Sequence, residues 1–231
     1  MTEQTFVRVM IEERVGVIVI DHPPVNALDE ATFVGLEGAF DRLLADEQIK
    51  VVVLTGSGDS FVAGADIRTL ANMSGAKDAR RLALRGQELC SKIEGSPKPV
   101  IAAINGRYCL GGGCELALAC HMRIAEARVK MGQPEIKLGL IPGWGASQRL
   151  PRLIGVGKAV ELILSGDHLR AKEALHLGLI NQVVSKGEAL EEAMRLAHRL
   201  SALSSVALAH ALDCIYTGLN KDFEAGLAYE A

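Results

Sequence analysis

The sequence has 231 residues, of which 49% are hydrophobic and 23% are charged, and its formal net charge at pH 7 is -3. These values are ordinary for a globular protein with a sizeable core, and the length fits one large α/β domain or two small ones. The charges form no long block of one sign. This argues against a nucleic-acid-binding face, although a small local patch stays open.

The cysteines and the N-terminus indicate the compartment. No apolar run reaches the roughly 18 residues that a membrane span needs, and the polar start Met1–Thr5 lacks the pattern of a signal peptide. The five cysteines lie mostly in apolar surroundings and show neither CxxC nor zinc-ligand spacing. They favour small buried side chains in a reducing compartment over disulfides. We therefore expect a cytoplasmic protein without a membrane partner, with an organelle matrix as the alternative.

The N-terminal part predicts two strands, a helix and a further strand. The strands are expected at residues 6–13 and 15–20, with a tight reversal at Arg14–Gly16. Residues 50–55 form a short apolar run suited to a buried strand. Asp29 is placed to cap a helix whose apolar face carries Phe33, Leu36, Phe40, Leu43 and Leu44.

The central part alternates helices and strands, with turns marked by glycine, proline and asparagine. We expect a loop at 56–60, helices from about Asp66 and from about Asp78 to Glu94, a strand at 100–104, a turn at Asn105-Gly106, a helix from the triple glycine to Cys120, a strand at 122–125, and little regular structure at 132–145.

From Ala146 onward the pattern is mostly helical, and Leu190, Met194 and Ala197 recur on one face of a late helix. The order of elements predicts an α/β fold with helices segregated toward the C-terminus. No linker or internal repeat is apparent. The last helical pattern reaches Ala231 without a stop signal, so the C-terminal segment is expected to be truncated or to continue beyond the ordered residues.

The first stretch with features of a ligand-binding site is Phe61–Ile67. Its small residues allow a ligand to approach the backbone closely. If Asp66 caps a following helix, the N–H of Ala65 stays unpaired and can face a ligand oxygen. Taken alone, however, the stretch is more typical of a plain helix entry that contains glycine.

The second stretch is Asn105–Glu115, with three glycines at a helix start. Glycines there cost stability, so a reason other than helix propensity is expected. They expose N–H groups at the positive end of the helix dipole, where an oxyanion is stabilised. Glu115 follows Gly112 by three residues and shares its helical face. Two alternatives stay open: close helix–strand packing with a solvated Glu115, and a phosphate loop, although the Gly-Lys-Ser/Thr ending is missing.

The third stretch is Gly132–Gly143, where Glu135 is a carboxylate among apolar residues bounded by proline and glycine. Partial burial there would raise its pKa toward the range useful for acid–base catalysis. An ordinary loop carboxylate paired with Lys137 is the alternative.

Together these stretches resemble the enoyl-CoA hydratase/isomerase family, also called the crotonase family, over nearly the whole chain. Each piece is weak alone, but their order and spacing are specific. The pieces that carry the resemblance are Pro24–Leu28, Ala63–Ile67, Pro99–Asn105, Gly111–Glu115, Gly132–Gly143 and Gln148–Pro151.

The resemblance implies a spiral of ββα units over residues 1–195 and a helical trimerisation segment at 196–231, assembled as a homotrimer or homohexamer. It also implies an acyl-CoA substrate whose thioester carbonyl is held by two backbone N–H groups. Matched residue by residue, these belong to Ala65 and Gly112. The implied substrate- and CoA-binding residues are Ala63, Gly64, Ala65, Asp66, Ile67 and Gly112.

The family's hydratases carry two glutamates, which match Glu115 and Glu135. The resemblance therefore implies that water is added to a trans-2-enoyl-CoA to give a 3-hydroxyacyl-CoA, in fatty-acid or related acyl-CoA degradation. Glu115 is expected to activate the water and Glu135 to supply the proton, with the two roles open to sharing. No metal or redox cofactor is expected, because CoA is part of the substrate. The alternatives are enoyl-CoA isomerisation or another acyl-CoA reaction, and a non-catalytic, RNA-binding role.

Three features depart from the family pattern, and one of them is the C-terminal helical segment, which is expected to be absent or cut short after Ala231. His121 follows Cys120 where an acidic residue is common, and it lies outside the proposed chemistry. Trp144 stands where a smaller residue is common, which is expected to narrow or reshape the acyl pocket.

Overall fold

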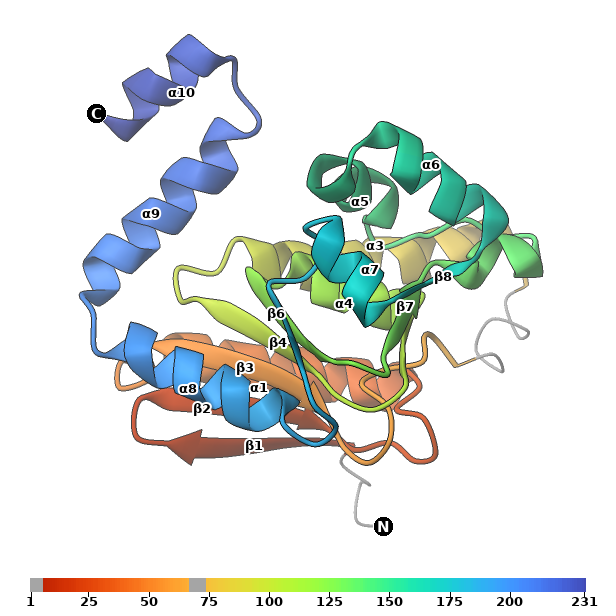
Figure 1. The fold of residues 1–231 in the computed structure, drawn as a ribbon, viewed down its shortest axis with the longest axis horizontal. Helices are drawn as coiled ribbons and strands as arrows, with labels where there is room; N and C mark the ends of the chain where they lie inside the picture. The colour runs from red at the N-terminus through yellow and green to blue at the C-terminus, as the bar shows by residue number, and fades with distance from the viewer. Residues whose placement is uncertain (1–5, 67–73) are drawn as a thin grey trace.

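The computed structural model describes residues 6–66 and 74–231, and its centre is a six-stranded sheet in the order β1-β2-β3-β4-β6-β9 (Figure 1). Strand β1 pairs antiparallel with β2, and all later pairs are parallel. The five strands that the sequence predicted in this sheet are confirmed within one residue at each end, and the sixth, β9, was not predicted. The strands are β1 Val7–Glu12, β2 Val15–Ile20, β3 Val51–Gly56, β4 Val100–Ile104, β6 Met122–Glu126 and β9 Gln182–Val184.

The reversal between β1 and β2 lies earlier than predicted. Val15 is already paired with Glu12, so the turn consists of Glu13 and Arg14, not Arg14–Gly16. Glu13 has a φ of 52°, in the left-handed region. A β-branched valine is poorly suited to that region, and this explains why Val15 joins the strand instead.

Helices cover both faces of the sheet, which explains why β2, β3 and β4 are apolar throughout instead of alternating. Helix α8 (Ala189–Ser201) lies on one face and packs Ala189, Ala193 and Ala197 against its valines and isoleucines. The apolar face predicted for this helix is confirmed, since Leu190 and Met194 pack there too. The other face is covered by α1 (Glu30–Ala45), α3 (Ala76–Glu94) and α4 (Gly112–Ala119).

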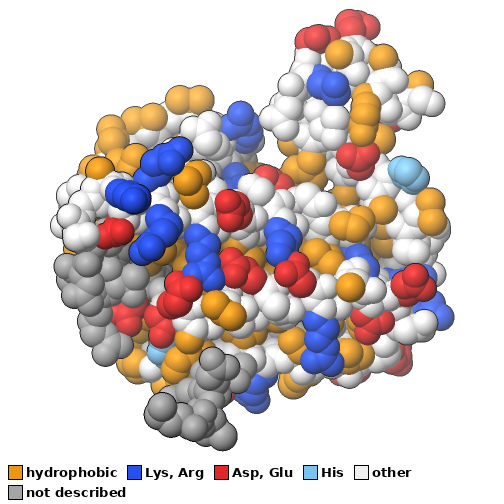
Figure 2. Space-filling view, turned by 180° about the vertical axis from the view of Figure 1, so that it is seen from behind, with side chains coloured by type: hydrophobic (Ala, Val, Ile, Leu, Met, Phe, Trp, Pro, Cys, Tyr) orange, Lys and Arg blue, Asp and Glu red, His pale blue; other side chains and the backbone are white. Residues whose placement is uncertain are grey.

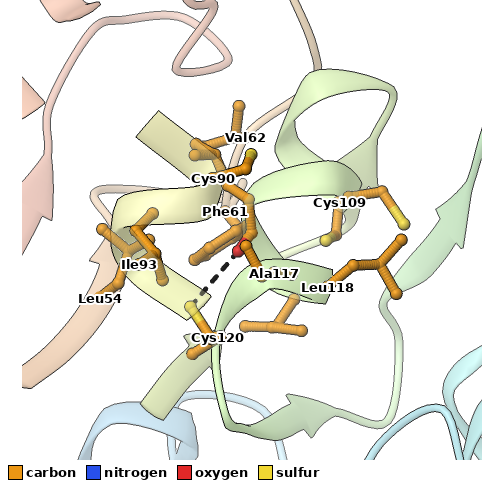
Figure 3. Close-up of a cluster of buried hydrophobic side chains, with 14 of the residues drawn as sticks. Leu54, Phe61, Val62, Cys90, Ile93, Cys109, Ala117, Leu118 and Cys120 are labelled. Carbon is orange, nitrogen blue, oxygen red and sulfur yellow. Dashed lines mark hydrogen bonds between the residues drawn. The ribbon is translucent and has the colours of Figure 1, made fainter. Parts of the chain in front are cut away.

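The core beneath α3 and α4 holds most of the cysteines (Figure 3). Cys90, Cys109, Cys114 and Cys120 are buried and Cys214 is half-buried, and all are free thiols. The Cys120 thiol donates to the Leu116 carbonyl over 3.3 Å, and burial raises its pKa to about 12. The prediction that they are small buried side chains is confirmed for four of the five cysteines.

A second, three-stranded sheet in the order β5-β7-β8 turns the fold into a spiral. Its strands are β5 Tyr108–Leu110, β7 Lys130–Gly132 and β8 His168–Arg170. Each turn passes from the large sheet to the small one and then into a helix. Two turns are β4-β5-α4 and β6-β7-η1, where η1 is the short 3-10 helix Pro134–Leu138. Bridges from Ser60 to Gly106 and from Val62 to Cys109 place residues 60–62 beside β5, so β3 begins an equivalent turn.

The predicted spiral of ββα units is therefore confirmed, but its short strands were missed by the sequence analysis. Three-residue strands have no periodic pattern, and their partners lie far away in the sequence. The expectation of little regular structure at 132–145 is wrong at its start, because Gly132 ends β7 and Pro134 begins η1. The remaining helices are α5 Ala146–Ile154, α6 Val156–Ser165 and α7 Ala171–His176.

Helices α9 (Ser205–Gly218) and α10 (Phe223–Glu230) form a C-terminal arm that stands away from the body (Figure 1), and a hollow separates the arm from the body (Figure 2). The structure describes every residue of both helices, and none of these residues is buried. The boundary predicted at residue 195 falls inside α8, which packs on the sheet up to Ser201. Within residues 6–66 and 74–231, no single helix is long and apolar enough to cross a membrane. Helices α8 and α9 pass that test only together and are bent by 108°.

Asn26 holds the segment that precedes Ala63. Its backbone has a φ of 57°, and its side chain is 2% exposed. Its amide nitrogen lies 2.8 Å from the Ser60 oxygen, 2.9 Å from the Ser57 oxygen and 3.1 Å from the Phe61 oxygen. Its amide oxygen accepts the His22 N–H over 2.9 Å.

We expect Asn26→Ala to lower the free energy of unfolding by about 2 to 3 kcal/mol, because buried carbonyl groups lose their donor. Urea unfolding measures the change. Asn26→Gly is the matched control, because it accepts the left-handed backbone and removes only the hydrogen bonds. A loss with alanine but none with glycine would mean that the backbone angle, and not the amide, is responsible.

Candidate active site

A cleft of about 1830 Å³ brings together residues from three turns of the spiral. Helix α9 of the C-terminal arm lines its outer end. The residues predicted for the site that line the cleft are Ala63, Gly64, Ala65, Gly112, Glu115 and Glu135. Asp66 is half-buried beside them. Ile67 and the helix predicted from Asp66 lie outside the residues that the structure describes.

The segment around Ala65 runs alongside Leu28 in a short parallel bridge. The Leu28 N–H donates to the Gly64 carbonyl over 2.9 Å, and the Asp66 N–H donates to the Leu28 carbonyl over 3.0 Å. This pairing leaves the N–H of Ala65 outside the ladder. Among the described parts of the chain, no group accepts a hydrogen bond from it. Ala65 therefore offers one backbone donor to the cleft.

The N-terminus of α4 offers a second donor at Gly112. The first N–H groups of a helix have no partner within it, and they carry the positive end of the helix dipole. The neighbouring N–H of Gly111 is already used, because it donates to the Gly132 carbonyl over 2.9 Å. The N–H of Gly112 has no partner among the described residues. An anion bound in the cleft beside α4 would meet this donor.

At each of the three glycine positions the structure disfavours a side chain. Gly111 has a φ of 51°, which favours a residue without a Cβ. A Cβ on Gly112 would lie 2.1 Å from Cζ3 of Trp144, and a Cβ on Gly113 would lie 2.3 Å from the Val62 carbonyl oxygen. Close packing, offered above as an alternative to a functional role, therefore holds for the glycines. Glu115 is not solvated, since its exposed fraction is 2%.

Glu115 is held by the loop after η1. One carboxylate oxygen, Oε1, accepts the N–H of Trp144 over 2.8 Å and the N–H of Ala146 over 3.0 Å. Burial raises the pKa of Glu115, while these two N–H groups and the positive charge of Arg149 oppose the rise. Its carboxylate is thus fixed in direction, with several groups near it that favour the charged form.

Glu135 lies on η1 and is half-buried. Burial raises the pKa of Glu135 to about 7, and the negative charge of Glu115 acts in the same direction. A Cβ added to Gly111 would lie 3.0 Å from Oε1 of Glu135, so this carboxylate lies close to the start of α4. Neither the burial nor the position supports the alternative of an ordinary loop carboxylate. Lys137 pairs with Asp167 instead, over 3.4 Å.

Gln133 was missed by the sequence analysis although it is fully buried beside Glu135. In the amide orientation that satisfies both groups, its nitrogen lies 3.2 Å from each carboxylate oxygen of Glu135. It thereby orients the carboxylate, which lies in the cleft wall formed by η1. In the sequence, its neighbours Gly132 and Pro134 indicated only irregular backbone and gave no sign of a role for Gln133.

Arg149 supports the loop that holds Glu115. Its guanidinium makes two bonds of 2.9 Å to the Glu94 carboxylate, and it donates to the Trp144 carbonyl over 2.9 Å. The backbone of Trp144 is therefore fixed on both sides of the residue, through its N–H and through its carbonyl group. The sequence offered only the short stretch Gln148–Pro151 as a signal, since Glu94 lies 55 positions away.

The described residues contain no cluster of three or more His, Cys, Asp or Glu side chains that could hold a metal ion. Four exposed cationic side chains lie along the outer part of the cleft: Arg80, Lys137, Arg152 and Lys221. The cleft thus combines two backbone donors, the carboxylates of Glu115 and Glu135, and several exposed cationic side chains.

The chain is also similar in sequence to known proteins. A model of the family described as "Enoyl-CoA hydratase/isomerase" matches residues 10–231. A "Probable enoyl-CoA hydratase" of Bacillus subtilis is 42% identical over 96% of this chain and 86% of its own length. A "Crotonyl-CoA hydratase" of Syntrophomonas wolfei is 41% identical over 95% of this chain and 85% of its own length.

A solved structure shares the fold. The crystal structure of an enoyl-CoA hydratase from Bacillus anthracis superposes with a TM-score of 0.93 at 36% identity. The alignment covers 97% of this chain and 88% of that one.

Proposed function

Because the chain belongs to the enoyl-CoA hydratase/isomerase family, we propose that it hydrates trans-2-enoyl-CoA thioesters to 3-hydroxyacyl-CoA, as a step of acyl-CoA degradation. The observation that carries the proposal is a pair of carboxylates, Glu115 and Glu135, that line one cleft beside the N–H of Gly112. The exposed cationic side chains of the cleft suit the phosphate groups of CoA, since such side chains attract phosphate oxygens.

In the proposed mechanism, the N–H groups of Ala65 and Gly112 bind the thioester oxygen. Addition of water at Cβ moves negative charge onto this oxygen, and donors fixed before the reaction stabilise that charge. The proposal is supported by the lack of other partners for both donors among the described residues, and by the helix dipole behind Gly112. Ala63, Gly64, Asp66 and Ile67 complete the proposed binding segment.

The two carboxyl groups divide the proton transfers in this proposal. Glu115, next to two N–H groups and near Arg149, is the better candidate for the ionised form and accepts a proton from water. The resulting hydroxide equivalent bonds to Cβ as the Cα–Cβ double bond opens. Glu135, with its raised pKa, delivers its proton to Cα. At this point Glu115 carries the proton taken from water and Glu135 has lost one, so a proton passes from Glu115 back to Glu135, directly or through solvent, before the next turnover. The net reaction adds one water molecule, so it balances without a metal or redox cofactor, and CoA enters with the substrate.

The test is loss of the conjugated thioester absorbance of crotonyl-CoA, with 3-hydroxybutyryl-CoA identified as the product. Rapid loss with that product supports hydration. If the absorbance stays constant while a 3-enoyl-CoA is converted into the conjugated thioester, the protein is an isomerase and the proposed reaction is wrong. RNA that binds while acyl-CoA does not would favour the non-catalytic alternative.

We also propose that the C-terminal arm joins copies of this chain into a homotrimer or homohexamer. The proposal is supported by its exposed apolar side chains, including Phe223 at 77% and Leu219 at 63% exposure. Such surfaces are rarely left open to water. Light scattering is expected to give three or six times the chain mass of 24.6 kDa. Phe223→Asp combined with Leu219→Asp should lower the measured mass, and a parent mass of one chain at micromolar concentration would contradict the proposal.

A cytoplasmic location remains part of the proposal. It is supported by the five free thiols, which suit a reducing compartment.

A further inference from the structure

The indole of Trp144 occupies space directly beside the proposed reaction centre. Its backbone N–H donates to Glu115 over 2.8 Å, and its ring touches Gly112 so closely that a Cβ there would lie 2.1 Å from Cζ3. The same ring lines the cleft, although only 5% of the residue is exposed. Trp144 thus lies next to both the proposed oxyanion donor and the proposed base.

The position of the ring is fixed on several sides. It meets Phe33 edge-on at 5.0 Å between centroids, with an interplanar angle of 79°. The five-membered ring of the indole lies against Gly86 in the middle of α3, where a Cβ would lie 2.2 Å from Cδ1. Glycine is unfavourable inside a helix, and contact with the ring gives Gly86 a structural reason. The backbone of Trp144 is held as well, because its N–H donates to Glu115 and its carbonyl accepts from Arg149.

We propose that Trp144 is a specificity-determining residue that limits the enzyme to short enoyl chains. This inference rests on the proposed function. With the thioester oxygen at Ala65 and Gly112, Cα and Cβ lie near the two carboxyl groups. Further acyl carbons must then pass along the indole. Because the ring is packed against Phe33, Gly86 and Gly112, it has little room to move aside.

The kinetic test compares crotonyl-CoA with trans-2-decenoyl-CoA in the parent, in Trp144→Ala and in Trp144→Phe. The ratio of kcat/KM for the long substrate to that for the short one cancels any common loss from disturbing Glu115. We expect the ratio to rise at least about 10-fold in Trp144→Ala, since even one methylene in a pocket is worth about that factor. Trp144→Phe, which keeps an aromatic ring, should change it much less. A ratio that stays within about 2-fold of the parent in Trp144→Ala overturns the inference.

A binding test needs no variant, because Trp144 is the only tryptophan in the chain. Its fluorescence is recorded while the parent is titrated with butyryl-CoA or decanoyl-CoA, saturated thioesters that cannot be hydrated. We expect butyryl-CoA to change the emission and to bind at least about 10-fold more tightly than decanoyl-CoA. Equal affinities, or butyryl-CoA binding without a change in emission, overturn the inference. A parent that fails to hydrate crotonyl-CoA but passes this test would contradict the proposed reaction alone.

Discussion

Glu115→Gln is expected to lower kcat for crotonyl-CoA hydration by about 100-fold to 10,000-fold, the usual contribution of a general base. The amide cannot accept a proton from water. Its oxygen can still accept the N–H groups of Trp144 and Ala146, which lie 2.8 and 3.0 Å from Oε1 in the parent. The fold and the affinity for butyryl-CoA should therefore change little.

Glu115→Ala separates the chemical role from the structural one. It removes the acceptor of two buried N–H groups as well as the base. We expect a loss in the free energy of unfolding of about 2 to 4 kcal/mol, measured by urea unfolding, in addition to the lost activity. If Glu115→Gln keeps more than a tenth of the parent kcat, Glu115 is not the base.

Glu135→Gln is expected to lower kcat by a similar factor, about 100-fold or more, because the amide cannot deliver a proton to Cα. Glu191→Gln is the matched control, because Glu191 is an exposed carboxylate on α8, outside the cleft, paired with Arg195 over 3.2 Å. It should keep the parent rate. When Glu115→Gln is added to Glu135→Gln, the loss should be far smaller than the product of the two, since the groups act as a unit.

The pH profile follows from the raised pKa of Glu135. The active free enzyme carries one proton on the pair of carboxyl groups, and Glu135 holds it with a pKa raised to about 7. As the pH rises through 7 this proton is lost, so kcat/KM for hydration should fall on the alkaline side. Dehydration of 3-hydroxybutyryl-CoA, the reverse reaction, also requires one proton on the pair. Its kcat/KM should therefore fall over the same alkaline range. A flat rate from pH 6 to 9 would contradict this assignment.

The sequence predicted the large sheet well because its strands have strong local signals. Strand β4 was predicted with the bounds that it has, and Asp29 does cap α1, accepting the Thr32 N–H over 2.9 Å. The short strands β5, β7 and β8, and β9 at the edge of the large sheet, were not predicted, since three residues give no period and their pairing depends on the whole spiral.

The candidate site was also predicted only in part. Glycines and carboxylates stand out in a sequence, so Gly112, Glu115 and Glu135 were selected before their positions were known. The groups that hold them are found only through space. Gln133 looked like a loop residue, and nothing local joins Arg149 to Glu94. Trp144 was noted as a departure, but its contacts with Gly86 and Gly112 depend on three separate elements.

The spiral also has a consequence for the time course of folding. Ala65 follows residues 60–62, which bridge to β5, Gly112 and Glu115 open α4 after β5, and Glu135 follows β7, so three successive turns supply one group or pair each. A refolding intermediate with only the first two turns docked would possess the anion-binding donors and the base but no proton donor. During refolding, recovery of catalysis should therefore lag behind recovery of thioester binding, and the interval between them would time the docking of the third turn.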